Sequence, residues 1–391
     1  MPASVIHASR ILTPQEEILD GVILVEGSRI SAVGHRDEIR IPEDAIDFVG
    51  SGMTVVPGFI DVHIHGAGGH DVMEGNAQAL DRVTSTVARR GTTSIVATTV
   101  TAEREQTCRS IEGIARYIRL RENAEERPRF GAEILGIHLE GPFISKERRG
   151  VHPPEDIAAP SLTVLDDFLD AGDGLVRIVT IAPEVPGAIE LIKHAVSKGI
   201  IAAIGHTDAE YEQARAGIRA GARHAVHMFN AMRPFSHRDP GVIGAVLTDP
   251  EVTAEVIADG VHVAGAAIQV LLLAKGLDQV ILVSDGIAAT GMRDGSYRVG
   301  TLQVEVSGGV ARNSEGKLAG STLTLDRAIR TLVGLGVSLT DAVRMATLLP
   351  ARRLGIAGKK GIIAPGADAD IVALDSDLHI AGVMTRGVGL N

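Results

Sequence analysis

The strongest constraint on the fold of this 391-residue chain lies in its middle, where short apolar runs alternate with longer amphipathic segments. Apolar strands that alternate with helices predict a parallel sheet buried on both faces. Eight such units over roughly 250 residues are typical of a (β/α)₈ barrel of the TIM type. The alternative is an open doubly wound sheet, but no GxGxxG motif follows the first run to favour it. The eight runs are 55–65, 93–99, 134–140, 176–183, 200–206, 224–230, 252–260 and 280–286.

The two ends of the chain differ from the middle. Residues 1–53 and 357–391 contain short β-type runs separated by turns, and the termini of folded domains often lie close together. We therefore predict that both ends form one small β-sandwich domain beside an α/β barrel of residues 54–356. A further β-type insertion at about 296–320 follows the eighth run, and we expect it to lie over the mouth of the barrel.

Composition excludes several classes of function. The formal net charge of −11 argues against nucleic acid or a membrane surface as a partner. Cys108 is the only cysteine, which excludes an internal disulfide and a thiolate metal cluster. The first residues lack the pattern of a signal peptide, and no apolar stretch is long enough to span a membrane. We expect a cytoplasmic protein that acts on a small molecule.

Most of the apolar runs end in a side chain that can bind a metal ion or transfer a proton. In a parallel barrel these ends face one side, which is where barrel active sites lie. His63 and His65 are two residues apart, so in a strand they point to the same face. Each such residue alone has a simple structural explanation, but the coincidence at several strand ends predicts a site for a divalent metal. The other terminal residues are Glu140, His206, His227, Asp259 and Asp285.

Longer motifs around these residues resemble a known family. The segment PGFIDVHIHG (57–66) is similar to the first barrel strand of the amidohydrolase superfamily. Five further motifs together resemble the N-acetylglucosamine-6-phosphate deacetylase family, and the resemblance covers nearly the whole chain. These motifs are HLEGPF (138–143), GHTDA (205–209), HMFNAM (227–232), IADGVH (257–262) and VSDG (283–286).

The resemblance implies a reaction and its metal. Members of the family remove the acetyl group from N-acetylglucosamine 6-phosphate in amino-sugar catabolism and cell-wall recycling, giving glucosamine 6-phosphate and acetate. The similarity implies one divalent ion on Glu140, His206 and His227, and a second on His63 and His65 with Glu140 as the bridge. It assigns Asp285 as a metal ligand and as the general acid and base. One or two ions per chain are expected, with zinc first and iron, manganese or cobalt as alternatives.

The same resemblance implies the contacts of the substrate. His152 is expected near the reacting end of the sugar. Asn230, the backbone amide of Ala231 and Arg238 are chemically suited to hold the phosphate. A homodimer is the family expectation, and the arginine is supplied from the same or the neighbouring subunit. The remaining expected contacts are Val151, His262, Leu318, Ala319 and Gly320.

Two other hypotheses remain open from the sequence. The first is another amidohydrolase that acts on a different N-acyl or cyclic amide substrate. Many such enzymes carry a carbamylated lysine in the fourth strand, and the run 176–183 has no lysine, which argues against them. The second is a metal-free barrel that serves as a scaffold, although every expected ligand is present in the sequence.

Overall fold

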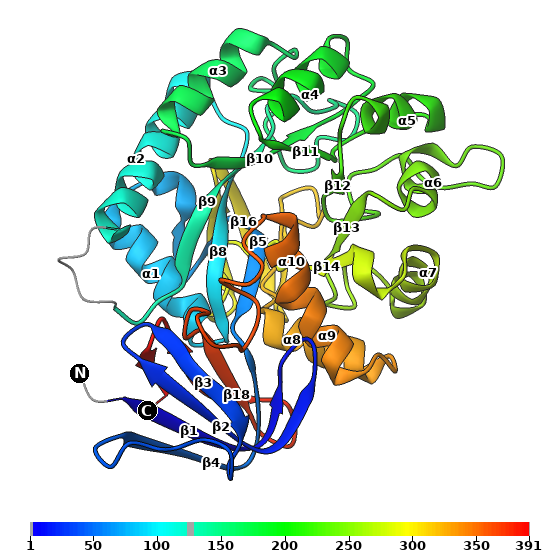
Figure 1. The fold of residues 1–391 in the computed structure, drawn as a ribbon. Helices are drawn as coiled ribbons and strands as arrows, with labels where there is room; N and C mark the ends of the chain where they lie inside the picture. Colours follow the sequence, from blue (N-terminus) through cyan, green and yellow to red (C-terminus); the bar gives the residue numbers. More distant parts are fainter. Residues whose placement is uncertain (1–2, 123–128, 391) are drawn as a thin grey trace.

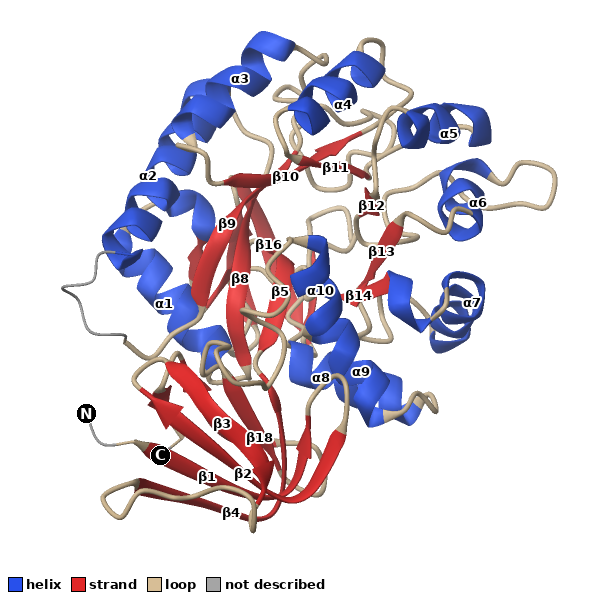
Figure 2. Cartoon of the chain, viewed as in Figure 1, coloured by secondary structure: helices blue, strands red, loops and turns tan. Residues whose placement is uncertain are grey.

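A barrel of eight parallel strands with helices on its outside forms the centre of the molecule (Figures 1 and 2). The computed structural model describes residues 3–122 and 129–390. The barrel closes where the N–H of Asp285 donates to the carbonyl of His63 at 2.9 Å and that of His65 donates to Gly286 at 2.8 Å. The predicted (β/α)₈ fold is confirmed. In order around the barrel, the strands are β5 (Phe59–Ile64), β8 (Thr92–Thr99), β9 (Glu133–Glu140), β10 (Val176–Ile181), β11 (Ile201–Ile204), β12 (His224–Ala225), β13 (Thr253–Val256) and β14 (Val280–Leu282).

The helices bury one face against the barrel. In α1 the side chain of Asn76 accepts the N–H of Ala79 at 3.0 Å and so begins the helix. Leu80, Val83 and Val87 then recur at helical spacing and are buried. The helices are α1 (Ala77–Ala88), α2 (Arg104–Glu122), α3 (Leu162–Ala171), α4 (Ala188–Ser197), α5 (Tyr211–Arg219), α6 (Gly241–Thr248), α7 (Gly265–Lys275), α8 (Leu325–Gly334), α9 (Leu339–Ala346) and α10 (Leu348–Arg353), with short 3₁₀ helices η1 (Val72–Glu74) and η2 (Leu277–Gln279).

Both ends of the chain contribute to one seven-stranded sheet, at the bottom of Figure 1. Strand β4 joins them, because it pairs with β1 in parallel and with β18 in antiparallel orientation. The sheet curls on itself, since Ile30 exchanges backbone hydrogen bonds of 2.8 and 2.9 Å with Gly366 and Ala367. The proposed division at residues 53 and 357 remains a prediction. The strands are β1 (Ser4–Leu12), β2 (Glu17–Glu26), β3 (Arg29–His35), β4 (Ile46–Pro57), β18 (Ile371–Leu374), β19 (Ile380–Thr385) and β20 (Val388–Gly389).

A small antiparallel sheet follows β14 and lies against the carboxyl end of the barrel strands. Its Val304 belongs to a buried apolar cluster with Val100, which follows β8, and Ile287, which follows β14. Asp71 adds a polar anchor, because its carboxylate accepts the N–H of Gly300 at 2.9 Å. The described part of the chain contains no helix with both the length and the apolar character needed to cross a membrane. The strands here are β15 (Gly295–Val299), β16 (Leu302–Ser307) and β17 (Val310–Arg312), and a two-stranded ribbon of β6 (Gly66–Ala67) and β7 (His70–Asp71) lies before η1.

A buried group of charges connects the end sheet to the barrel. The ammonium of Lys360, whose side chain is 2% exposed, lies 2.7 Å from the carboxylate of Glu133 at the start of β9. It also lies 2.9 Å from Asp368 and 2.6 Å from Asp370, which precede β18. Burial lowers the pKa of Lys360, but the three carboxylates outweigh burial and raise it above its usual range. The lysine therefore neutralises carboxylates from both parts of the fold.

The Lys360→Met variant keeps the length of this side chain and removes its charge. We expect the free energy of unfolding to fall by about 3–5 kcal/mol, because the loss of one partner leaves buried charges uncompensated. Urea denaturation followed by circular dichroism measures the change. The matched control is Lys359→Met at an exposed position, with an expected change within about 0.5 kcal/mol. Equal midpoints for the two variants would contradict the stabilising role of Lys360.

Candidate active site

Six side chains meet at the carboxyl ends of the barrel strands, and Glu140 at the end of β9 is their centre. One carboxylate oxygen of Glu140 lies 3.2 Å from Nε2 of His63 and 2.9 Å from Nε2 of His227. The other oxygen lies 3.3 Å from Nε2 of His65, which is itself 3.1 Å from the carboxylate of Asp285. The six residues expected to ligate metal are thus brought together. This group, the Glu140 cluster, consists of His63, His65, Glu140, His206, His227 and Asp285.

The outer ring nitrogens of two histidines show which atoms face the cluster. Nδ1 of His65 lies 3.0 Å from the carbonyl oxygen of Thr98, and Nδ1 of His206 lies 2.9 Å from that of Arg148. A carbonyl oxygen can only accept, so each Nδ1 carries a hydrogen and donates it. In a neutral ring the other nitrogen, Nε2, then presents a lone pair to the carboxylate of Glu140. Histidines that bind metals are held in this way.

The spacing of the ligand atoms fits a bound cation. Nε2 of His63 is buried and has no hydrogen-bond partner among the described residues. Nε2 of His206 lies 3.1 Å from Nε2 of His227, and the two atoms approach the same carboxylate oxygen of Glu140 at 3.1 and 2.9 Å. Atoms bound at about 2.0–2.1 Å to one tetrahedral ion lie about 3.3 Å apart. A shared cation would satisfy the buried Nε2 of His63, and the histidine and carboxylate groups of the cluster form a candidate site for a divalent metal.

The charges of the cluster lead to the same conclusion. Burial lowers the pKa of His65, but its contacts with Asp285 and Glu140 outweigh burial and raise the pKa to about 10. Burial raises the pKa of Glu140, but His63 and His206 outweigh it and hold that pKa well below its usual range. The buried carboxylates therefore require positive charge beside them, either as protons on the imidazoles or as a metal ion.

Three members of the cluster have a strained backbone. His206, His227 and Asp285 have φ angles of 46°, 28° and 51°, in the left-handed region that residues with a side chain rarely adopt. Such a conformation costs of order 1–3 kcal/mol and persists where surrounding contacts impose it. Here backbone hydrogen bonds do so, such as those from Ser145 N–H to the carbonyl of His206 and from Asp285 N–H to the carbonyl of His63, both at 2.9 Å. The chain turns sharply at each strand end and directs the side chain inward.

His152 differs from the histidines of the cluster. Its Nδ1 accepts the backbone N–H of Thr101 at 3.2 Å, so the hydrogen of the neutral ring lies on Nε2. Burial and His206 lower its pKa to about 4, so the ring is neutral at pH 7. Nε2 lies 3.5 Å from the carboxylate of Glu140, at the edge of the cluster. His152 is therefore suited to donate a hydrogen bond to a substrate.

Glu255 was not identified from the sequence as a residue of the site. Asp259 was grouped with the strand-end residues, although it does not belong to the Glu140 cluster. Glu255 is fully buried on β13, and its carboxylate lies 2.8 Å from Nδ1 of His63. The sequence feature that could have identified Glu255 is a carboxylate within the otherwise apolar run 252–260. Asp259 instead accepts from Nδ1 of His262 at 2.7 Å and from the N–H of Val261 at 2.8 Å. It orients His262 at the wall of the site.

A cavity of about 170 Å³ lies above the cluster. His262 projects into it from one side, and the insertion contributes Leu318 and Gly320. Ala319 between them is fully buried and packs into the core of the insertion. Most of the expected substrate contacts thus share one cavity, whose other predicted lining residues are Val151, His152, Asn230 and Ala231.

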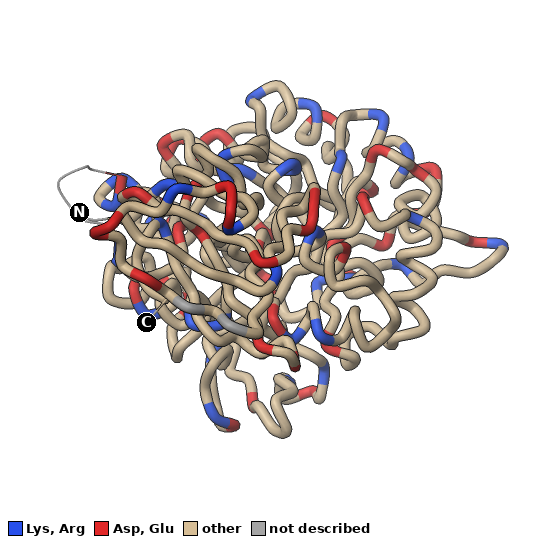
Figure 3. Tube along the Cα trace, turned by 60° about the horizontal axis from the view of Figure 1, so that its bottom comes forward, with Lys and Arg blue, Asp and Glu red and all other residues tan. Residues whose placement is uncertain are grey.

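Arg238 lies away from this cavity. It is exposed in the segment that joins β12 to α6, which projects from the barrel in Figures 1 and 3. Phe235, in the same segment, is 55% exposed. Arg233 nearer the barrel is engaged instead by the carboxylates of Asp208 and Asp239. Within its own chain, Arg238 is therefore not among the residues that line the cavity.

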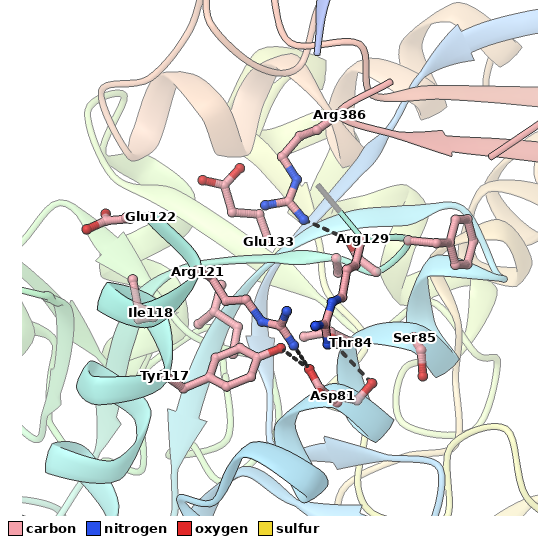
Figure 4. Close-up of a pocket in the computed structure, with 14 residues that line it drawn as sticks. Asp81, Thr84, Ser85, Tyr117, Ile118, Arg121, Glu122, Arg129, Glu133 and Arg386 are labelled. Carbon is pink, nitrogen blue, oxygen red and sulfur yellow. Dashed lines mark hydrogen bonds and ion pairs between the residues drawn. The ribbon is translucent and has the colours of Figure 1, made fainter. Parts of the chain in front are cut away.

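A larger cavity of about 280 Å³ lies at the opposite end of the barrel, near the first residue of β9, Glu133. Tyr117 and Arg121 both direct their polar groups at Asp81 (Figure 4). Glu133 is paired with Lys360. These polar side chains of the larger cavity are thus paired with other side chains. The imidazoles of the Glu140 cluster lie at the smaller cavity. The chemistry of the site therefore belongs to the smaller cavity.

Comparison with known proteins gives a consistent result. The model of the amidohydrolase family matches residues 54–389. The N-acetylglucosamine-6-phosphate deacetylase of Bacillus subtilis (strain 168) is 37% identical over 385 residues, which cover 96% of this chain and 94% of the relative. The N-acetylgalactosamine-6-phosphate deacetylase of Escherichia coli O157:H7 is 36% identical over 384 residues, which cover 98% of each chain.

Solved structures agree along the whole length. One is the N-acetyl-D-glucosamine-6-phosphate deacetylase of Mycobacterium smegmatis in complex with N-acetyl-D-glucosamine-6-phosphate. It has a TM-score of 0.91 and 39% identity, with 100% of both chains covered. The N-acetylglucosamine-6-phosphate deacetylase of Pasteurella multocida has a TM-score of 0.91 at 30% identity, with 99% of both chains covered.

Bound metal should stabilise the folded chain, because the Glu140 cluster forms only on folding. A ligand present at 100 times its Kd adds about 2.7 kcal/mol to the free energy of unfolding. We expect chelator-treated protein to melt at a lower temperature and added Zn²⁺ to restore the loss, as measured by thermal scanning. The Glu140→Gln variant removes the central charge and should respond less. A response of equal size in that variant would place the stabilising metal elsewhere.

Proposed function

Since this chain belongs to the amidohydrolase family, we propose that it hydrolyses the N-acetyl group of N-acetylglucosamine 6-phosphate, giving glucosamine 6-phosphate and acetate. The observation that carries this proposal is the Glu140 cluster at the floor of a cavity of about 170 Å³. The relatives with this activity in their names span nearly the whole chain. The reaction belongs to amino-sugar catabolism and cell-wall recycling.

The metal of the proposed enzyme is one or two divalent ions per chain. Glu140, His206 and His227 would hold one ion, and His63, His65 and Asp285 would hold the second together with Glu140. Imidazole and carboxylate ligands favour zinc, with iron, manganese and cobalt as alternatives. When bound, a divalent cation lowers the pKa of a coordinated water and polarises a carbonyl group.

Asp285 moves the proton in this proposal. Burial raises its pKa, but His65 and His63 outweigh burial and hold the pKa below its usual range, so the carboxylate is ionised at neutral pH. It takes a proton from the attacking water and gives it to the amine nitrogen, because an unprotonated amine leaves poorly. His152 donates its Nε2 hydrogen to the acetyl oxygen, in keeping with its neutral ring.

Residues around the cavity hold the sugar and its phosphate. His262 and the backbone of residues 318–320, with Ala319 between Leu318 and Gly320, lie along the sugar, with Val151 beside His152. Asn230 and the backbone of Ala231 face the phosphate from the turn after β12. Ala231 has a φ angle of 50°, which turns this segment toward the cavity. The positive charge that would pair with the phosphate comes from Arg238.

We place Arg238 in the site of a neighbouring subunit of a homodimer. Its own segment projects from the barrel beside α6 (Figure 1), and Arg238 is not among the residues that line the cavity. Helix α7 packs beside α6 and exposes Val270 and Leu273, and Leu277 of the following η2 is also exposed; Leu273 is 86% exposed. Exposed apolar side chains of this kind are a surface that a second copy would cover.

The proposed location is the cytoplasm, where a sugar phosphate is made and retained because its charge prevents passage through a membrane. A second substrate deserves a parallel test, since one relative is an N-acetylgalactosamine-6-phosphate deacetylase. The alternative of a different N-acyl or cyclic amide substrate is disfavoured by β10, whose sequence VRIVTI has no lysine.

Acetate release from N-acetylglucosamine 6-phosphate tests the proposed reaction. The Asp285→Asn variant should lose about 10²–10⁴-fold in kcat, because that is the usual contribution of a general acid and base. Unphosphorylated N-acetylglucosamine and N-acetylgalactosamine 6-phosphate are the comparison substrates, and the melting temperature of the variant monitors its fold. Absence of acetate from both phosphorylated sugars, in protein shown to carry metal, would overturn the proposal.

Mixed dimers test the placement of Arg238. Arg238→Ala should lower kcat/KM by about 10- to 100-fold, because a hydrogen bond to a charged group contributes about 1.5–3 kcal/mol. In a heterodimer of Arg238→Ala and Asp285→Asn chains, one site regains both groups only if the arginine crosses between subunits. Activity near half of the native dimer is therefore expected. Activity no higher than that of the two variants would place Arg238 in its own subunit.

A further inference from the structure

Glu255 on β13 is a fully buried carboxylate that contacts the Glu140 cluster from below. One oxygen lies 2.8 Å from Nδ1 of His63 and accepts the backbone N–H of His227 at 3.1 Å. The other oxygen lies 2.8 Å from Nε2 of His224. A buried carboxylate is costly unless it is paired and hydrogen-bonded. These contacts supply that pairing, and two of them belong to residues of the cluster.

The contact with His63 determines which ring nitrogen faces Glu140. A carboxylate accepts the hydrogen of Nδ1, which leaves Nε2 directed at the Glu140 carboxylate at 3.2 Å. His65 and His206 are held differently, because their Nδ1 atoms donate to neutral carbonyl oxygens. A carboxylate partner makes an imidazole a more basic ligand. The Nδ1 atom of His63 therefore contacts a charged carboxylate, whereas the Nδ1 atoms of His65 and His206 contact neutral carbonyl groups.

Glu255 also fixes the turn that carries His227. This residue has a φ angle of 28°, and its N–H is held by the carboxylate of Glu255. The backbone carbonyl of Glu255 accepts the N–H of Met228 at 2.9 Å. One residue thus supports a ligand on β5 and a ligand after β12.

We propose that Glu255 is a positioning residue that sets the metal affinity of the His63 side of the Glu140 cluster, by holding Nε2 of His63 toward the cluster and by placing a carboxylate charge against its Nδ1. The inference rests on the proposed function for the presence of metal in the cluster. It concerns the binding of metal and not turnover. The charge of Glu255 is the property that matters, since an amide of the same shape can still accept a hydrogen from Nδ1.

A purely structural role would have a different signature. His224 is held between Glu255 and the hydroxyl of Thr253, at 2.8 and 2.7 Å, so these polar groups also pack the barrel interior. If Glu255 served only this packing, its loss would lower the stability of the metal-free protein. It would leave the affinity of the folded protein for metal unchanged.

The test is the Glu255→Gln variant of the metal-loaded protein. Titration with a competing chelator, with retained zinc measured by plasma mass spectrometry, should show 10- to 100-fold weaker binding, the usual effect of removing such a support. The matched control is Glu133→Gln, the same change at the opposite end of the barrel, which should retain native affinity. Thermal melting of both metal-free variants monitors the fold.

A double variant tests whether Glu255 acts through His63. His63→Gln alone weakens zinc retention, and adding Glu255→Gln should then cause a smaller loss than it causes in the native chain, because part of its effect passes through His63. Native zinc affinity in Glu255→Gln, or an additive loss in the double variant, would overturn the proposal. Acetate release is not part of this readout, so a failure here leaves the proposed hydrolysis to its own test.

Discussion

A carboxylate buried inside a barrel is stable only with positive charge or hydrogen-bond donors beside it. The arrangement of the site follows from this requirement at Glu140. The imidazoles of His63, His65, His206 and His227 surround its two oxygens at 2.9–3.3 Å. Charge balance then favours a cation among them. The same imidazoles hold the pKa of Asp285 below its usual range, through His65 and His63, whereas His152 stays neutral first because it is buried.

The barrel supplies the geometry that this charge requires. Parallel strands bring residues that are distant in sequence to one rim, and short strands such as β12 leave the chain free to turn at once. The turns place His206, His227 and Asp285 in a backbone conformation that is unfavourable for residues with side chains. The surrounding barrel therefore holds these three residues in their unfavourable backbone conformation. Its backbone hydrogen bonds keep the side chains of the Glu140 cluster in place without bound substrate.

The barrel and the Glu140 cluster were predictable from sequence, because each depends on a local pattern. The apolar runs mark the strands, and a polar residue at the end of a parallel strand has only one rim to reach. Glu255 was not predictable in this way, since its role depends on the contact of β13 with β5, which no local pattern encodes. The position of Arg238 was equally hidden, because the path of a projecting segment depends on tertiary packing. The tautomers of His65 and His152 required their hydrogen-bond partners to be seen.

The three-stranded insertion that follows β14 forms part of the cavity wall, whereas the side chains of the Glu140 cluster come from the barrel. The residues of this wall and the residues of the Glu140 cluster thus lie in separate parts of the chain. An apolar contact and the carboxylate of Asp71 join the two parts. Substitutions in the insertion can reshape the space around the sugar while the charge balance at Glu140 stays intact. The residues that would contact the sugar can therefore differ between relatives while the ligands at Glu140 stay the same. Relatives named for epimeric sugars are the outcome expected of such a division.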